Sequence, residues 1–155
     1  MVTRIAEWVY NSYLDEALDA EPDFRVPNLV KIDTEGFELK ILCGAGRTLS
    51  DHHPPLFFEY FPEFIRREGG DPDVLFDLLR RYGYVHFIFY DGGGNLLTSL
   101  TGGQEDQIQS LRRYCELRHV FFDAAAFHAS DSAWSHEFER CEMDFFERAL
   151  HLRLA

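Results

Sequence analysis

The sequence predicts an α/β domain, because two short apolar runs are joined by a helical stripe and both runs end on carboxylates. The first run, Leu29–Ile32, is rich in β-branched residues, as expected for a strand covered on both faces. The second run is Leu56–Phe58. Between them, apolar residues recur at one-turn spacing, which is typical of a helix: Phe37, Ile41, Ala45 and Leu49. Two parallel strands joined by a helix form a right-handed crossover unit.

Three carboxylates follow these two strands. Asp33 and Glu35 come directly after the first strand, and Glu59 follows the second. In open α/β sheets, ligands bind at the carboxyl ends of the strands, so we expect these side chains to form a site. Gly36 either supplies an ordinary permissive turn or lets a ligand approach the backbone closely. Glu38 is sufficiently explained by the dipole of the helix that it begins.

The next part of the chain is predicted from caps and turns. Asp71-Pro72 combines an N-cap with a proline at the first helical position, so a helix is expected from there to Tyr82. Val85–Tyr90 is strongly β-prone, and the glycine-rich turn after it favours a hairpin over a phosphate-binding loop. Phe61–Gly70 is predicted to be an aromatic, charged loop, and residues 98–103 a second loop.

The C-terminal part is predicted from periodicity. Gln104–Leu117 has the pattern of a helix, and His119–Phe122 that of a last, antiparallel strand. From residue 130 to residue 153, apolar residues repeat every three to four positions, which indicates an amphipathic helix whose apolar stripe is core or interface.

Composition bounds the class of protein. A chain of 155 residues with 46% hydrophobic residues fits a single domain spanning residues 1–155. The net charge of −12 argues against binding to nucleic acids or anionic membranes. There is no transmembrane run and no signal-peptide pattern, and three widely spaced cysteines fit a reducing cytoplasm. No metal site is predicted, because adjacent His52 and His53 rarely face one ion.

One stretch resembles a known family. The residues LVKIDTEGFELKILCGAGRTL (29–49), followed by PPLFFEY (54–60), resemble the FkbM-type methyltransferases, which use S-adenosylmethionine. The most specific part is the pattern K-I-D-x-E-G-x-E at residues 31–38. Weaker matches are the SYLD segment at residues 12–15 and the helix end at residues 79–84, and the resemblance covers Tyr13–Phe122.

The resemblance implies a fold and a chemistry. It implies a truncated, Rossmann-like class I methyltransferase sheet with helices on both faces and an antiparallel final strand. Its α/β core is expected at residues 28–123, after an N-terminal segment at residues 1–27. It also implies O-methyl transfer from S-adenosylmethionine to a small-molecule or sugar hydroxyl. Asp33 is then expected at the junction of cofactor and acceptor, Gly36 beside the cofactor, and Glu35 and Glu59 among the catalytic residues.

One departure from the family leaves other functions open. The family binds its cofactor mainly through a glycine-rich loop after the first strand, whereas no glycine precedes Leu29 here. The first three strands are therefore expected to be missing, which makes the strand at residues 28–32 an edge. Either residues 4–13 cover this edge or a second copy pairs with it as a homodimer. The alternatives to an active enzyme are a non-catalytic module for protein interaction or dimerisation, and a piece of a longer gene product.

Overall fold

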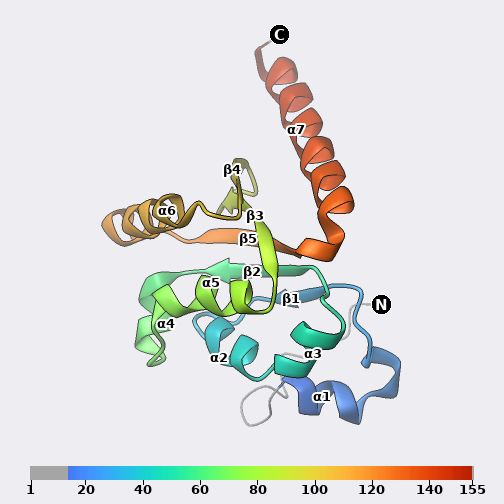
Figure 1. Cartoon of the computed structure of the whole chain (residues 1–155). Coiled ribbons are helices and arrows are strands. Elements are labelled where there is room, and N and C mark those ends of the chain that lie inside the picture. Colours follow the sequence, from blue (N-terminus) through green and yellow to red (C-terminus); the bar gives the residue numbers. More distant parts are fainter. Residues whose placement is uncertain (1–13, 155) are drawn as a thin grey trace.

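The computed structural model of the chain describes residues 14–154 and contains a five-stranded sheet (Figure 1). The strand order is β1-β2-β5-β3-β4. The strands are β1 (Val30–Ile32), β2 (Leu56–Tyr60), β3 (Tyr84–Asp91), β4 (Leu96–Thr101) and β5 (Phe122–His128). β1 and β2 are parallel, and the other pairs are antiparallel. The predicted parallel pair and the antiparallel final strand are thus confirmed.

Helices cover both faces of the sheet, as predicted. The helices are α1 (Leu14–Ala20), α2 (Glu38–Cys43), α3 (Gly46–Asp51), α4 (Pro62–Arg67), α5 (Pro72–Arg81), α6 (Glu105–Arg118) and α7 (Ser132–Leu154), with short 3₁₀ turns at Pro22–Phe24 and Ala129–Asp131. α2, α5 and α6 pack in the larger core on one face. On the opposite face, Phe138 and Phe146 of α7 pack against β3 and β5. No helix within residues 14–154 is both long and apolar enough to span a bilayer.

The larger core is centred on the ring of Phe76 from α5. Its centroid lies 4.9–6.1 Å from four rings of β2 and β3, namely Phe58, Tyr60, Phe87 and Phe89. Tilted and edge-on contacts of this kind add to the free energy gained by burying the rings. The helix that carries Phe76 begins as predicted, because the Asp71 carboxylate accepts a hydrogen bond of 3.0 Å from the backbone N–H of Asp73.

The last strand lies later in the chain than predicted. His119–Phe122 is not a strand, because α6 runs to Arg118 and His119 ends it in a left-handed conformation at φ 52°. β5 begins at Phe122 and extends past the expected core boundary at residue 123. Its centre is Ala124–Ala126, a run with weak intrinsic β preference. Pairing with β2 on one side and β3 on the other overrides that preference.

The predicted loop at Phe61–Gly70 is also wrong. Pro62 starts helix α4 at its first position, where a missing backbone N–H costs nothing. The side chain of Ile65 is fully buried, and the rings of Phe61 and Phe64 lie 4.2 Å apart. The predicted loop at residues 98–103 is wrong in its first part, because β4 continues to Thr101. In both places tertiary packing produces a helix or a strand, although the local sequence has no clear hydrophobic period.

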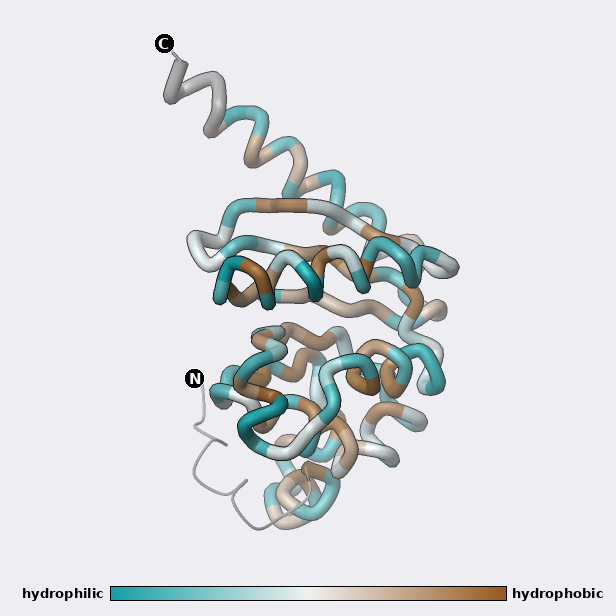
Figure 2. The backbone as a smooth tube through the Cα atoms, turned by 90° about the vertical axis from the view of Figure 1, so that its left-hand side faces the viewer, coloured by the Kyte–Doolittle hydropathy of each residue, from teal (hydrophilic) through white to brown (hydrophobic). Residues whose placement is uncertain are grey.

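Two elements, β1 and α7, leave part of their surface uncovered by other described residues. β1 lies at the edge of the sheet, and no strand within residues 14–154 pairs with its outer side. Residues 4–13, one of the two expected covers, lie outside the described residues. α7 packs on the sheet as far as Phe146, and its C-terminal part extends away from the rest of the molecule (Figure 2).

A glycine substitution tests how tightly α4 packs on the turn after β1. Gly36 has φ +109°, and a Cβ there would lie 2.5 Å from the carbonyl oxygen of Phe64. Gly69 has φ +81° with no atom within 4 Å of the same position. We expect Gly36→Ala to lower the free energy of unfolding by roughly 3 kcal/mol or more, because it combines backbone strain with overpacking.

The matched control is Gly69→Ala, which introduces the strain alone and should cost about 1 kcal/mol. Urea unfolding of both variants measures the difference. Equal losses in the two variants would contradict the close packing of Phe64 on Gly36.

Candidate functional site

The turn after β1 is held by a buried carboxylate. Glu38 is fully buried and accepts three hydrogen bonds of 2.9 Å, from the backbone N–H and the hydroxyl of Thr34 and from the backbone N–H of Gly36. A buried carboxylate is tolerated when donors satisfy it in this way. Glu38 therefore does more than respond to the helix dipole, because it sets the path of the chain from β1 into α2.

The predicted site residues of this turn differ in their surroundings. Asp33 is exposed, and its carboxylate accepts a hydrogen bond of 2.9 Å from the ammonium group of Lys31. Glu35 is exposed and has a left-handed backbone at φ 53°, and its carbonyl oxygen accepts a hydrogen bond of 3.2 Å from Arg67. Gly36 is buried, with its N–H bound to Glu38 and the space beside it filled by α4. The close approach that Gly36 allows is thus to the backbone of Phe64.

Glu59 lies on the same face of the sheet as α7. It is half-buried, and in the β2–β5 register it stands opposite Asp123, which stands opposite Tyr90 of β3. Burial raises the pKa of the Tyr90 phenol, and the nearby carboxylate of Glu142 on α7 raises it as well. A row of acidic and phenolic side chains therefore runs across the sheet, next to the turn that carries Asp33.

The carboxylates of this region influence one another's ionisation. Burial, together with the negative charges of Glu38, Asp33, Asp123 and Glu35, raises the pKa of Glu59 to about 7. Burial and the charge of Asp33 also raise the pKa of Asp123, while Lys31 lowers it. A carboxyl group with a pKa near 7 can both accept and release a proton at neutral pH, as general acids and bases do.

The structure thus brings the predicted residues into one electrostatic group but in different roles. Asp33 and Glu35 offer exposed carboxylates at the carboxyl end of β1. Glu59 offers a half-buried, readily protonated one on β2. Sequence analysis missed Asp123, because its strand was predicted to end before it. The only signal was the acidic residue at the end of an apolar run.

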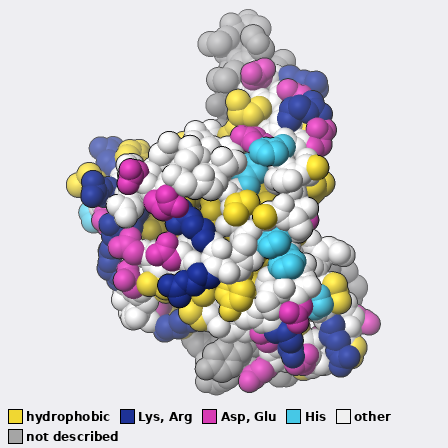
Figure 3. Space-filling view, viewed as in Figure 1, with side chains coloured by type: hydrophobic (Ala, Val, Ile, Leu, Met, Phe, Trp, Pro, Cys, Tyr) yellow, Lys and Arg dark blue, Asp and Glu magenta, His cyan; other side chains and the backbone are white. Residues whose placement is uncertain are grey.

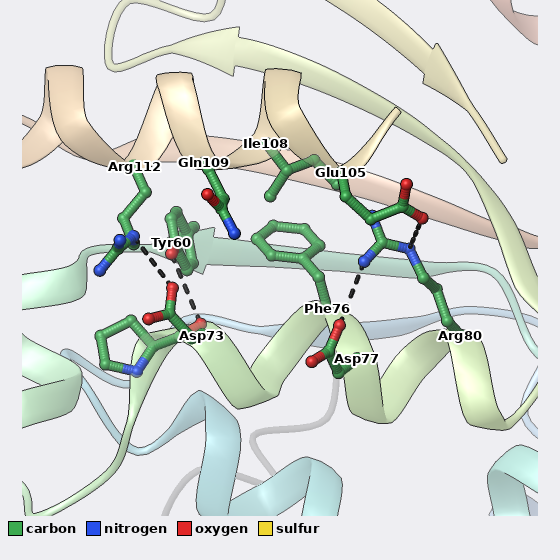
Figure 4. Close-up of a pocket in the computed structure, with 10 residues that line it drawn as sticks. Tyr60, Asp73, Phe76, Asp77, Arg80, Glu105, Ile108, Gln109 and Arg112 are labelled. Carbon is green, nitrogen blue, oxygen red and sulfur yellow. Dashed lines mark hydrogen bonds and ion pairs between the residues drawn. The ribbon is translucent and has the colours of Figure 1, made fainter. Parts of the chain in front are cut away.

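Two pockets lie elsewhere in the molecule. The one between α5 and α6 has a volume of about 90 Å³, and ion pairs cross its mouth (Figure 4). Arg112 Nε is 2.9 Å from Asp73 Oδ1, and Arg80 Nε is 3.8 Å from Glu105 Oε1 (Figure 4). Ligand pockets usually have volumes of about 300–1,000 Å³, so this pocket is small for a ligand. It is instead the gap that the ion pairs bridge between α5 and α6. The second pocket, of about 430 Å³, lies between the β3–β4 hairpin and α6. Neither contains the predicted carboxylates.

Sequence analysis also missed a cluster of two histidines and a glutamate. His86 of β3 lies beside His136 and Glu139 of α7, so the cluster joins two elements far apart in the chain. Burial lowers the pKa of His86. The only local signal was the three-residue spacing of His136 and Glu139, which places both on one side of a helix. The space-filling view shows histidine side chains next to α7 (Figure 3).

One of three comparisons with known proteins gives a match. Residues 9–86 match the methyltransferase FkbM domain. The match spans half of the chain and includes Asp33, Glu35, Gly36 and Glu59. The chain therefore belongs to the FkbM methyltransferase family. No curated protein and no solved structure matches the chain.

The raised pKa of Glu59 predicts how stability depends on pH. Glu59 has a pKa of about 7 in the fold and an ordinary value of 4.5, so its ionisation disfavours the folded state as pH rises through that window. Glu59→Gln removes this contribution. Discounted for solvent screening, the variant should gain about 1 kcal/mol relative to wild type between about pH 5 and about pH 8.

Urea unfolding of both proteins at the two pH values provides the measurement. Glu16→Gln is the control, because Glu16 is an exposed acid on α1 that is not among the charges acting on Glu59. A difference between Glu59→Gln and wild type that is the same at both pH values would contradict the assigned environment of Glu59.

Proposed function

We propose that this chain takes part in methyl transfer from S-adenosylmethionine to a hydroxyl group of a small molecule or sugar. The observation that carries the proposal is Glu59, a half-buried carboxyl group with a pKa of about 7 on the parallel β1–β2 pair of an FkbM family member. A hydroxyl acceptor needs a base that is partly ionised at neutral pH, and Glu59 meets that requirement. Its place beside the carboxyl end of β1 fits the edge where α/β sheets bind ligands.

The described residues fit the cofactor in their chemistry. S-adenosylmethionine, when bound, supplies a methyl group on a positively charged sulfur. The carboxylates of Asp33 and Glu35 are exposed at this edge and attract a cation. Gly36 fits a cofactor contact poorly, because its N–H is already bonded to Glu38 and α4 fills the space beside it. The proposal therefore assigns contact with the cofactor to Asp33.

The residues of the chain then have distinct tasks. Asp33 contacts the cofactor near the point where it meets the acceptor. The turn held by Glu38 fixes the position of Asp33. Glu59 accepts the proton of the acceptor hydroxyl, and the nearby charge of Asp123 helps to keep its pKa close to neutral. Orientation of the acceptor by these groups supplies much of the rate. The three cysteines are free thiols, which supports a reducing cytoplasm as the setting.

Calorimetric titration of S-adenosylmethionine, and of its demethylated product, tests the cofactor assignment. We expect micromolar binding that Asp33→Ala weakens by about tenfold, because a charge contact with the cofactor is lost. Asp77→Ala is the matched control, since Asp77 is an exposed acid on α5 whose only ion pair with another described residue is with Arg80. The absence of binding at millimolar cofactor would contradict the proposal.

Methyl transfer to a panel of hydroxyl acceptors separates binding from chemistry. Glu59→Gln should leave cofactor affinity within about twofold and slow transfer by about 10²–10⁴-fold, as the loss of a general base does. The wild-type rate should rise with pH up to about 7, as Glu59 ionises.

A second function, dimerisation as a non-catalytic module, is favoured by the outer edge of β1, with which no strand within residues 14–154 pairs. Val30 donates its N–H to the carbonyl oxygen of Pro55, on the side of β2. Because successive residues of a strand direct their backbone groups to opposite sides, the N–H of Lys31 points to the outer side of the sheet. An unpaired strand edge is a template for another chain. α7 adds exposed apolar side chains, which are Trp134, Met143 and Phe145. We propose that a second copy of this chain pairs at the β1 edge.

Sedimentation equilibrium at micromolar concentration tests the homodimer. Lys31→Pro should give a monomer, because proline removes the outward N–H and leaves the bonds between β1 and β2 intact. Lys31→Ala is the control that removes only the ion pair with Asp33, and it should remain a dimer. A wild-type monomer, or a Lys31→Pro dimer, would contradict pairing at this edge.

A further inference from the structure

Three metal-ligating side chains converge where α7 leaves the sheet. His86 comes from β3, and His136 and Glu139 come from α7. One donor atom of each lies within 4.8 Å of the donor atoms of the other two. Two imidazoles and a carboxylate are a ligand set that holds zinc and other divalent transition metals.

The distances within the cluster suit a shared ion better than hydrogen bonds. His86 Nε2 is 3.4 Å from Glu139 Oε2, and His136 Nδ1 is 3.7 Å from the same oxygen. Both distances exceed the usual 2.7–3.2 Å range of N–H···O hydrogen bonds. Two ligands that each lie about 2.1 Å from a tetrahedral zinc ion are about 3.4 Å apart. The three groups are therefore spaced as ligands around a common centre.

Packing fixes the ligands before any ion arrives. His86 is only 3% exposed, and its Nε2 is 2.8 Å from the hydroxyl of Ser99 on β4, a hydrogen bond that a metal ion at Nε2 would replace. The first turns of α7 are seated on Phe127, whose ring lies 5.2 Å from that of Trp134 and 5.5 Å from that of Phe138. A preformed arrangement lowers the entropic cost of binding.

The buried histidine also has an unmet polar atom. His86 Nδ1 is buried and has no hydrogen-bond partner among the described residues. A buried imidazole in an apolar sheet face is costly without a compensating interaction. Since the ion would lie on the Nε2 side of the ring, it would not satisfy Nδ1, and the site is inferred from the arrangement of the three ligands alone.

We propose that His86, His136 and Glu139 form a divalent metal site, with zinc as the best-suited ion, that ties α7 to β3. His136 is largely exposed, so the fourth coordination position faces solvent and takes water. Because the ligands come from both elements, the ion stabilises the attachment of α7, the element that otherwise extends away from the sheet (Figure 2). The site is separate from the carboxylates proposed for methyl transfer.

The test is calorimetric titration of Zn²⁺ into the full chain after treatment with a chelator, together with the visible absorption of the Co²⁺ form. Wild type should bind one ion tightly, and Co²⁺ should give a tetrahedral spectrum. His136→Ala and Glu139→Gln should each weaken binding by about 10- to 100-fold, because each removes one ligand. Both residues belong to α7 and His86 belongs to β3, so both variants keep the buried ring of His86.

His119→Ala is the control, because His119 is an exposed histidine paired with Glu63 in a different part of the molecule. It should bind like wild type. Hydrogen exchange gives a second readout, in which Zn²⁺ slows exchange in the first turns of α7 in wild type and not in Glu139→Gln. No binding of Zn²⁺, or binding unchanged in both ligand variants, would overturn the proposal.

Discussion

The structure of the candidate site depends on the carboxylate of Glu38. With three hydrogen bonds of 2.9 Å, it closes the turn from Thr34 to Gly36 and joins the end of β1 to the start of α2. The same turn brings Gly36 against the backbone of Phe64, which fixes α4 on this edge. Asp33 and Glu35 owe their positions to this turn. A single buried acid thus organises the region in which other acids remain exposed.

A concentration of negative charge is the second property of this region. Glu59 pairs across the sheet with Asp123 rather than with a basic residue, although a neutral or basic neighbour would stabilise the fold more. The result is a carboxyl group whose pKa is about 7. Perturbed pKa values of this kind gather at functional sites, where structure that is unfavourable for stability serves chemistry. The stretch that matches the FkbM methyltransferase family includes Glu59 and Asp33 but not Asp123.

The two faces of the sheet differ in how they are covered. On one face, α2, α5 and α6 enclose the larger core around Phe76. On the other, Phe138 and Phe146 of α7 pack on β3 and β5, and the row from Glu59 to Tyr90 crosses β2, β5 and β3. α7 therefore meets both the acidic row, through Glu142, and the histidine cluster, through His136 and Glu139. A change in how α7 is attached would alter the surroundings of both.

Local sequence determined the elements whose signals lie within a few residues. The strand before Asp33, the helix begun by Asp71-Pro72 and the glycine-rich hairpin turn after β3 all follow from period, cap and turn chemistry. Tertiary structure decided the rest. The alanines of β5 form a strand only because β2 and β3 flank them, and α4 is a helix because Ile65 and Phe64 find packing partners.

The same division holds for the site. The acidic residues after β1 and β2 could be identified from the sequence, because a strand end in an α/β sheet is a local feature. Pairing of Glu59 with Asp123, and convergence of His86 with His136 and Glu139, could not be, because each joins strands or helices that are distant in the chain. Sequence by itself determined which residues could carry chemistry here. Only the tertiary structure decided which of them share an electrostatic environment, because that depends on register and packing between distant segments.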